Sequence, residues 1–164
     1  MALITKDIAG ELTSYLASHK YDRTYILTDT NTRNACLPLL QPVQTLRQAE
    51  VITIEAGDTH KDIEQVARIW TILSQSGASR HSLLINLGGG MVTDLGGFAG
   101  ATFKRGLHTL NIPTTLMAAV DAAVGGKTGI NFNGLKNEIG AFYPPDAVLI
   151  DTAFLRSLDR DNIL

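Results

Sequence analysis

The chain has 164 residues, a length that fits one domain with a substantial hydrophobic core. Its formal net charge of -2 gives no electrostatic basis for binding nucleic acid, and no apolar stretch reaches the roughly 20 residues that a membrane-spanning helix needs. The single cysteine, Cys36, excludes an internal disulfide framework, so we expect a reducing, cytoplasmic environment.

The predicted elements begin with a helix over residues 6–20, where apolar side chains recur at helical spacing. Two short β-rich segments follow, at residues 24–29 and 51–57. These segments alternate with helical patterns, which is typical of an α/β domain.

A second helix is predicted from His60 to Gly77, with Asp58 or Thr59 as its N-cap and Gly77 as its end. Three more strands are predicted after it, at residues 82–90, 108–113 and 147–151. The last residues, RSLDRDNIL, have the composition of a turn or of the start of a helix.

Short strands separated by helices predict a Rossmann-like parallel sheet with helices on both faces, formed by residues 1–164 as one domain. In such sheets ligands bind beyond the carboxyl ends of the strands. We therefore expect Asp29, Gly88 to Asp94, and Pro113 to Thr115 to lie on one rim.

Glycines are unevenly distributed, since 12 of the 15 lie between Gly88 and Gly140 among apolar residues. This clustering favours a ligand-binding surface over a plain loop region. Within it, residues 85–100 (INLGGGMVTDLGGFAG) run from a buried strand through three glycines into a helix-compatible segment. Backbone N–H groups at such a helix start bind phosphate oxygens. Thr93 stands where the usual dinucleotide fingerprint has glycine, so a tight strand–helix turn without ligand stays open as an alternative.

The segment GGKTG, residues 125–129, contains the end of a P-loop motif. A P-loop also needs glycine five positions before Gly126, where this chain has Asp121. The sequence therefore excludes an ATPase of that type, and Lys127 remains a candidate partner for phosphate or carboxylate.

Several charged and amide side chains stand in apolar, glycine-rich surroundings: Asp121, Lys127, Lys136, Asn137 and the pair Lys104–Arg105. They form either a solvated surface or a positively lined pocket for an anionic, phosphorylated substrate, and the surroundings favour the pocket. None of the four histidines has metal-ligand spacing, so no metal site is predicted in this chain.

Four segments in this order resemble the 3-dehydroquinate synthase family, almost continuously from Asn86 to Leu158: GGGMVTDLGGFAGATFKRG, IPTTLMAAVDAAVGGKTGIN, LKNEIGAFYPP and VLIDTAFLRSL. The first 80 residues match more loosely. The resemblance implies a two-domain enzyme with an N-terminal Rossmann-like NAD domain and a helical C-terminal domain. It implies conversion of the seven-carbon phosphate DAHP to 3-dehydroquinate and phosphate, in the shikimate pathway of aromatic amino acid biosynthesis.

By this resemblance, Lys127 and Asn137 contact the substrate phosphate, and Lys136 lies where nicotinamide and substrate meet. Asp121 binds both cofactor and substrate. Arg105 reaches the phosphate site of a neighbouring subunit, which implies a homodimer.

The resemblance also implies an NAD site. Asp29 would hold the adenosine ribose, Gly89 and Gly90 the pyrophosphate, and Lys61 would lie on the ribose side. The other implied cofactor contacts are Asp58, Asp94, Thr114, Thr115, Met117, Asp121, Lys127 and Lys136.

The chain departs from the family pattern at several positions. Asp58 replaces a common Glu, which puts its ribose contact in question, while Met117 replaces a common Leu. The family's metal ligands, which bind zinc or cobalt, would lie beyond Leu164, so we expect a shortened form of a longer protein that binds NAD weakly and is inactive alone.

Three alternatives remain. The first is another sugar-phosphate cyclase, such as a 2-deoxy-scyllo-inosose or valiolone synthase. The second is a polyol dehydrogenase of the glycerol dehydrogenase type, which performs net hydride transfer. The third is a nucleotide-binding module without catalysis.

Overall fold

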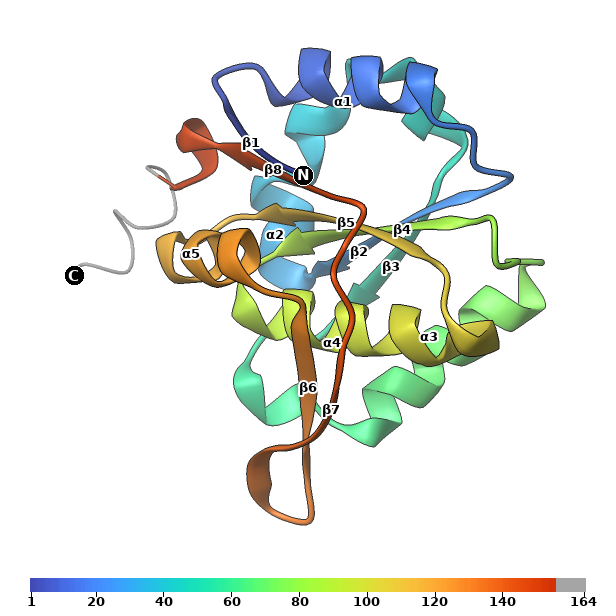
Figure 1. Ribbon diagram of the computed structural model, residues 1–164, viewed down its shortest axis with the longest axis vertical. Coiled ribbons are helices and arrows are strands. Elements are labelled where there is room, and N and C mark those ends of the chain that lie inside the picture. The colour runs from blue at the N-terminus through green and yellow to red at the C-terminus, as the bar shows by residue number, and fades with distance from the viewer. Residues whose placement is uncertain (156–164) are drawn as a thin grey trace.

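The computed structural model describes residues 1–155, without the side chains of residues 122–124, and it contains the predicted parallel α/β sheet (Figure 1). The predicted turn or helix start in RSLDRDNIL lies outside the described residues. The sheet has the strand order β1-β8-β5-β4-β2-β3, and all its pairs are parallel. Its strands are β1 (Ala2–Thr5), β2 (Thr24–Asp29), β3 (Glu50–Ile54), β4 (Leu83–Gly88), β5 (His108–Pro113) and β8 (Ala147–Asp151).

Helices cover both faces of the sheet, as expected. They are α1 (Ile8–Ser18), α2 (Thr30–Ala35), α3 (Ile63–Gln75), α4 (Gly90–Thr102) and α5 (Leu116–Val124), joined by the short 3-10 helices η1 (Leu37–Leu40), η2 (Gln44–Gln48), η3 (Asp58–His60) and η4 (Phe103–Arg105). In Figure 1, α1 lies on one side of the sheet, and α3, α4 and the hairpin of β6 (Lys127–Phe132) and β7 (Leu135–Phe142) lie on the other. Within the described residues, no helix combines the length and apolar character that crossing a membrane requires.

The strand side chains alternate between two cores, as a parallel sheet buried on both faces requires. On β4, Leu83, Ile85 and Leu87 face the core beneath α1, η1 and η2. On the opposite face, Leu84 joins the core beneath α3 and α4. The short strands of the sheet therefore read as continuous apolar runs.

A two-stranded antiparallel hairpin is the main element that the sequence analysis did not predict. It consists of β6 (Lys127–Phe132) and β7 (Leu135–Phe142), and it packs against α4 outside the main sheet. Most of β7 is exposed, so its sequence carries little of the hydrophobic pattern from which strands are predicted. The edge strand β1 was also not predicted.

Several predicted boundaries were wrong, among them those of the first helix, which was predicted over residues 6–20 and spans Ile8–Ser18. The strand at 51–57 ends at Ile54, and that at 82–90 ends at Gly88, because Gly90 already begins α4. The second helix begins at Ile63, and its N-cap is Asp62, which accepts a hydrogen bond from the Gln65 N–H; the predicted caps Asp58 and Thr59 belong to η3. A 3-10 turn thus precedes the helix. Gly77 has φ +85° and follows the helix, as predicted.

Several of the clustered glycines serve close packing, contrary to the prediction that the cluster is a ligand surface. A Cβ at Gly96 would overlap the Asn86 side-chain oxygen, and one at Gly97 or Gly100 would stand 2.5 Å from a threonine methyl group. These three glycines let α4 lie close to β4, β5 and β6. Other glycines of the cluster, Gly125, Gly126 and Gly129, line a cavity, and a Cβ at Gly90 would meet nothing within 4 Å.

Replacement of Gly96 by alanine is expected to destabilise the fold by about 1–3 kcal/mol, because overpacking outweighs the higher helix propensity of alanine. Thermal unfolding measures the change. Gly90→Ala is the matched control, since nothing lies within 4 Å of its Cβ position. Equal melting temperatures for the Gly96→Ala variant and the unmodified chain would contradict this close packing.

Candidate active site

The carboxyl ends of β2, β4 and β5 form the rim that the sequence predicted. Gly88 on β4 and Pro113 on β5 are register partners, and the Thr114 N–H donates to the Gly88 carbonyl at 2.9 Å. At the end of β2, Asp29 caps α2, and its Oδ1 accepts a hydrogen bond from the Thr32 N–H at 2.8 Å. Asp29, Gly88 to Asp94 and Pro113 to Thr115 therefore follow neighbouring strands of one sheet.

The start of α4 has the features of an anion-binding helix terminus. Gly89 is its N-cap and provides no side-chain cap, so the first backbone N–H groups of the helix have no intrahelical acceptor. A Cβ at Gly90 would meet nothing within 4 Å, whereas one at Gly89 would stand 3.2 Å from the Thr115 methyl group. The helix dipole adds to the attraction for an anion at this terminus.

Two threonines follow β5 on the same rim. The Thr114 side chain is fully buried, and its Oγ1 has no hydrogen-bond partner among the described residues. Thr115 caps α5 through a hydrogen bond from the Ala118 N–H to its Oγ1 at 3.1 Å. Met117, in the first turn of α5, is 77% exposed.

A buried lysine joins three parts of the chain. Lys61 is only 4% exposed, and its Nζ lies 2.6 Å from Asn137 Oδ1, 3.2 Å from Asp94 Oδ2 and 3.5 Å from Asp58 Oδ1. These contacts tie the segment before α3 to α4 and to the hairpin. The Lys61 carbonyl also accepts a hydrogen bond from the Asn131 N–H at 2.7 Å. Four predicted site residues therefore form one cluster.

A cavity of about 760 Å³ lies beside this cluster, between α4, β5 and the hairpin. Its lining includes the predicted site residues Asp94, Asp121, Lys127 and Asn137. The expected positively lined pocket is not found in this part of the chain, because the charged lining residues are two carboxylates and one lysine. Lys136 on β7 is exposed and does not line the cavity.

Arg105 lies apart from the rim. It ends η4, which follows the C-terminus of α4 and precedes β5, so it stands at the amino edge of the sheet. Lys104 and Arg105 have φ values of 48° and 67°, a left-handed conformation that costs free energy in residues other than glycine. Arg105 is therefore not among the residues that line the cavity described above.

The structure supports the exclusion of a P-loop. Lys127 is the first residue of β6, and no helix follows the GGKTG segment as the P-loop motif requires. In the described part of the chain, no group of three or more histidine, cysteine, aspartate and glutamate side chains is arranged to hold a metal ion.

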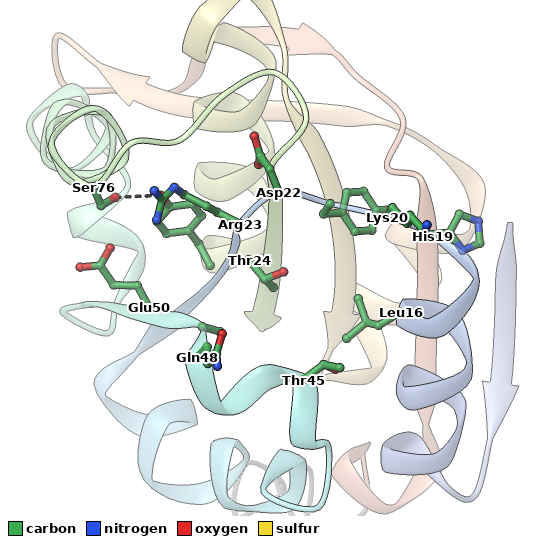
Figure 2. A pocket seen from close by; sticks show the side chains of 13 residues that line it. Leu16, His19, Lys20, Asp22, Arg23, Thr24, Thr45, Gln48, Glu50 and Ser76 are labelled. Atoms are coloured by element: carbon green, nitrogen blue, oxygen red, sulfur yellow. Dashed lines mark hydrogen bonds between the residues drawn. The ribbon is translucent and has the colours of Figure 1, made fainter.

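A second polar cavity, of about 490 Å³, lies at the amino ends of β2 and β3 (Figure 2). Lys20, Arg23 and Glu50 are among its lining residues. Of the described residues that line it, none belongs to the predicted site.

The Asp94 carboxyl group has a pKa above its ordinary value, chiefly because burial disfavours its charged form; nearby Lys61 opposes the shift. The folded protein therefore holds this proton more tightly than the unfolded chain. The contribution of Asp94 to stability falls as the pH rises from the unfolded to the folded pKa.

A carbon-13 NMR titration of the Asp94 carboxyl is expected to give a raised midpoint, and a still higher one in the Lys61→Met variant. A midpoint at or below the ordinary aspartate value would contradict this.

Comparison with known proteins places these features in a family. Residues 51–164 match the family model described as 3-dehydroquinate synthase N-terminal. The 3-dehydroquinate synthase of Parabacteroides distasonis is 64% identical over 162 residues, which are 99% of this chain and 46% of the relative. That of Pyrococcus furiosus is 43% identical over 154 residues, 94% of this chain and 45% of the relative. The chain thus spans less than half the length of these curated relatives.

Solved structures share the fold. A 2-deoxy-scyllo-inosose synthase complexed with carbaglucose-6-phosphate, NAD⁺ and Co²⁺ has a TM-score of 0.87 and 23% identity, covering 94% of this chain and 43% of that one. A 2-epi-5-epi-valiolone synthase from Streptomyces hygroscopicus with NAD⁺ and Zn²⁺ bound has a TM-score of 0.81 and 27% identity, with the same coverage.

Proposed function

Since the chain belongs to the 3-dehydroquinate synthase N-terminal family, we propose that it is the NAD-binding domain of a 3-dehydroquinate synthase in the shikimate pathway. The observation that carries the proposal is the cavity between α4, β5 and the hairpin, where residues named by the family resemblance meet. The complete enzyme would convert DAHP to 3-dehydroquinate and phosphate. It would carry its zinc or cobalt ligands in a second domain outside this chain.

The residues on the rim fit a bound dinucleotide. The uncapped start of α4 offers the N–H groups near Gly89 and Gly90 to a pyrophosphate. The hydroxyl of Thr114, which has no hydrogen-bond partner among the described residues, lies on the adjoining strand end. Asp29 uses Oδ1 as a helix cap, which leaves Oδ2 to accept a ribose hydroxyl. Thr115 and Met117 would line the same site. NAD, when bound, supplies reversible hydride transfer.

The residues around the cavity would bind the substrate and hold its phosphate. Lys127 would pair with the phosphate, Asn137 would hydrogen-bond to it, and Asp121 would contact both substrate and cofactor. Lys136 is exposed on β7 of the hairpin. In this proposal it contacts the ligand when the second domain is present. Lys61 would hold Asp94 and Asn137 in position through the contacts already described.

Arg105 would act in a neighbouring subunit, so the proposal includes a homodimer. Its position at the amino edge supports this assignment. A cytoplasmic location is also proposed, since the only cysteine is a buried free thiol whose pKa is raised by burial to about 11.

Calorimetric titration with NAD tests the cofactor assignment, first on the 164-residue chain and then on the full-length protein. Saturable binding by the full-length protein is expected, with weaker binding by the chain alone because half of the cleft is then missing. Gly90→Val, which fills the open space at the start of α4, should abolish or strongly weaken binding. Absence of NAD binding by the full-length protein would overturn the assignment.

A further inference from the structure

Two asparagines stand side by side in the sheet beneath α4. Asn86 on β4 and Asn111 on β5 are register partners, and they are 0% and 7% exposed. Asn86 Nδ2 donates a hydrogen bond to Asn111 Oδ1 at 3.0 Å. A buried amide pair is costly unless its donors and acceptors are used.

Gly96 fixes which way the Asn86 amide points. The Asn86 oxygen occupies the space that a Cβ at position 96 would fill, and it has no hydrogen-bond partner among the described residues. An NH₂ group there would leave two donors without an acceptor, whereas an oxygen can accept weak C–H contacts. The oxygen therefore lies against Gly96, and the NH₂ group of Asn86 points to Asn111.

This arrangement determines what Asn111 presents to the cavity. Its oxygen is occupied by Asn86, and its Nδ2 donates no hydrogen bond to any residue in the described part of the chain. Asn111 lines the cavity together with Asp94 and Lys127. A nearly buried amide thus has N–H donors available at the wall of the proposed active site.

We propose that Asn111 is a further binding residue of this site, whose N–H donates to an acceptor oxygen of the bound ligand, and that Asn86 is the positioning residue that holds it. The inference rests on the proposed function. The oxygen belongs either to the carboxamide of NAD or to the phosphorylated substrate, since both offer an acceptor. By the same chemistry, a side chain at position 111 that carries acceptors alone, such as a carboxylate, could not donate to this ligand oxygen.

Asn111→Asp in the full-length protein tests the proposal. Aspartate keeps the shape of asparagine and still accepts the hydrogen bond from Asn86, but it replaces the donor facing the cavity with an acceptor and adds a negative charge to a cavity that Asp94 and Asp121 also line. The dissociation constant for NAD, the KM for DAHP and the melting temperature are measured. We expect at least one of the two ligand constants to rise about tenfold or more while the protein stays folded. Gln75→Glu, an exposed site at the end of α3, controls for the change in net charge, and the uncharged double variant Asn86→Leu with Asn111→Leu controls for the charge placed in the cavity.

The two ligand measurements distinguish the sources of the oxygen. A rise confined to the NAD constant assigns it to the carboxamide, and a rise confined to KM assigns it to the substrate. Changes below twofold in both, with the fold intact, would overturn the proposal. If the unmodified protein binds NAD but forms no dehydroquinate, the proposed function fails while the NAD constant still tests Asn111.

A double variant covers the case in which Asn111→Asp does not fold. Asn86→Leu with Asn111→Leu removes both partners together, so no buried polar group is left unpaired. We expect this variant to fold and to lose ligand affinity by a similar factor. Unchanged affinity in the folded double variant would contradict a binding role for Asn111.

Discussion

Lys127→Ala in the full-length protein is expected to lower kcat/KM for DAHP by about 10²–10³-fold, the usual loss when one preorganised charged or donor group is removed from an active site. Among the described residues that line the cavity, Lys127 is the one with a cationic side chain. Two carboxylates, Asp94 and Asp121, line the same cavity and would repel a phosphate without it. The fold should tolerate the change because Lys127 is exposed.

Steady-state kinetics with phosphate detection measures this loss, and thermal unfolding checks the fold. The matched control is Lys20→Ala, which removes an exposed lysine from the cavity at the opposite edge of the sheet (Figure 2). Its kinetic constants should equal those of the unmodified enzyme. A loss below tenfold in Lys127→Ala, or an equal loss in both variants, would contradict the role assigned to Lys127.

Lys61→Met is expected to destabilise the protein by about 1–3 kcal/mol. Breaking a fully buried ion pair costs about 3–5 kcal/mol, and the loss is smaller here because Asp94 and Asp58 are partly exposed, with side-chain exposures of 34% and 49%. The variant leaves Asp94 without its cation and Asn137 without the Nζ donor. Urea unfolding measures the change in the free energy of unfolding.

A double-mutant cycle with Asp94→Asn separates this mechanism from a general packing defect. In the Lys61→Met background, Asp94→Asn removes the uncompensated carboxylate and should restore part of the lost stability. Strictly additive effects of the two substitutions would show that Lys61 and Asp94 are not coupled, and the cluster would then lose its proposed role of holding the site together.

Much of the sheet could be predicted from the sequence because its strands are buried on both faces. The segments that became β2, β5 and β8 were predicted with their observed bounds, since a buried parallel strand is a short apolar run between turns. The hairpin could not be found in this way. Its second strand is exposed along most of its length, and it is held by pairing with β6 and by packing on α4.

The candidate site was predicted in part, for a related reason. Family resemblance named Asp94, Asp121, Lys127 and Asn137, which the fold brings to one cavity. Asn111 carried no motif, because within HTLNIP it looks like one polar residue in a strand. The binding role proposed for Asn111 depends on Asn86 and Gly96. Both come close to Asn111 only when the sheet forms and α4 packs on it.

The most direct test of the whole account is turnover of DAHP by the full-length protein supplied with NAD and zinc or cobalt, with dehydroquinate, phosphate and NADH measured in the same reaction. A dehydroquinate synthase should form dehydroquinate and phosphate in equal amounts, require NAD and leave no net NADH, because the hydride that it removes is returned within each turnover. Net NADH formation from a polyol without phosphate release would identify a polyol dehydrogenase. A carbocycle formed from another sugar phosphate, with DAHP unchanged, would identify a different cyclase, and either result would contradict the proposed function.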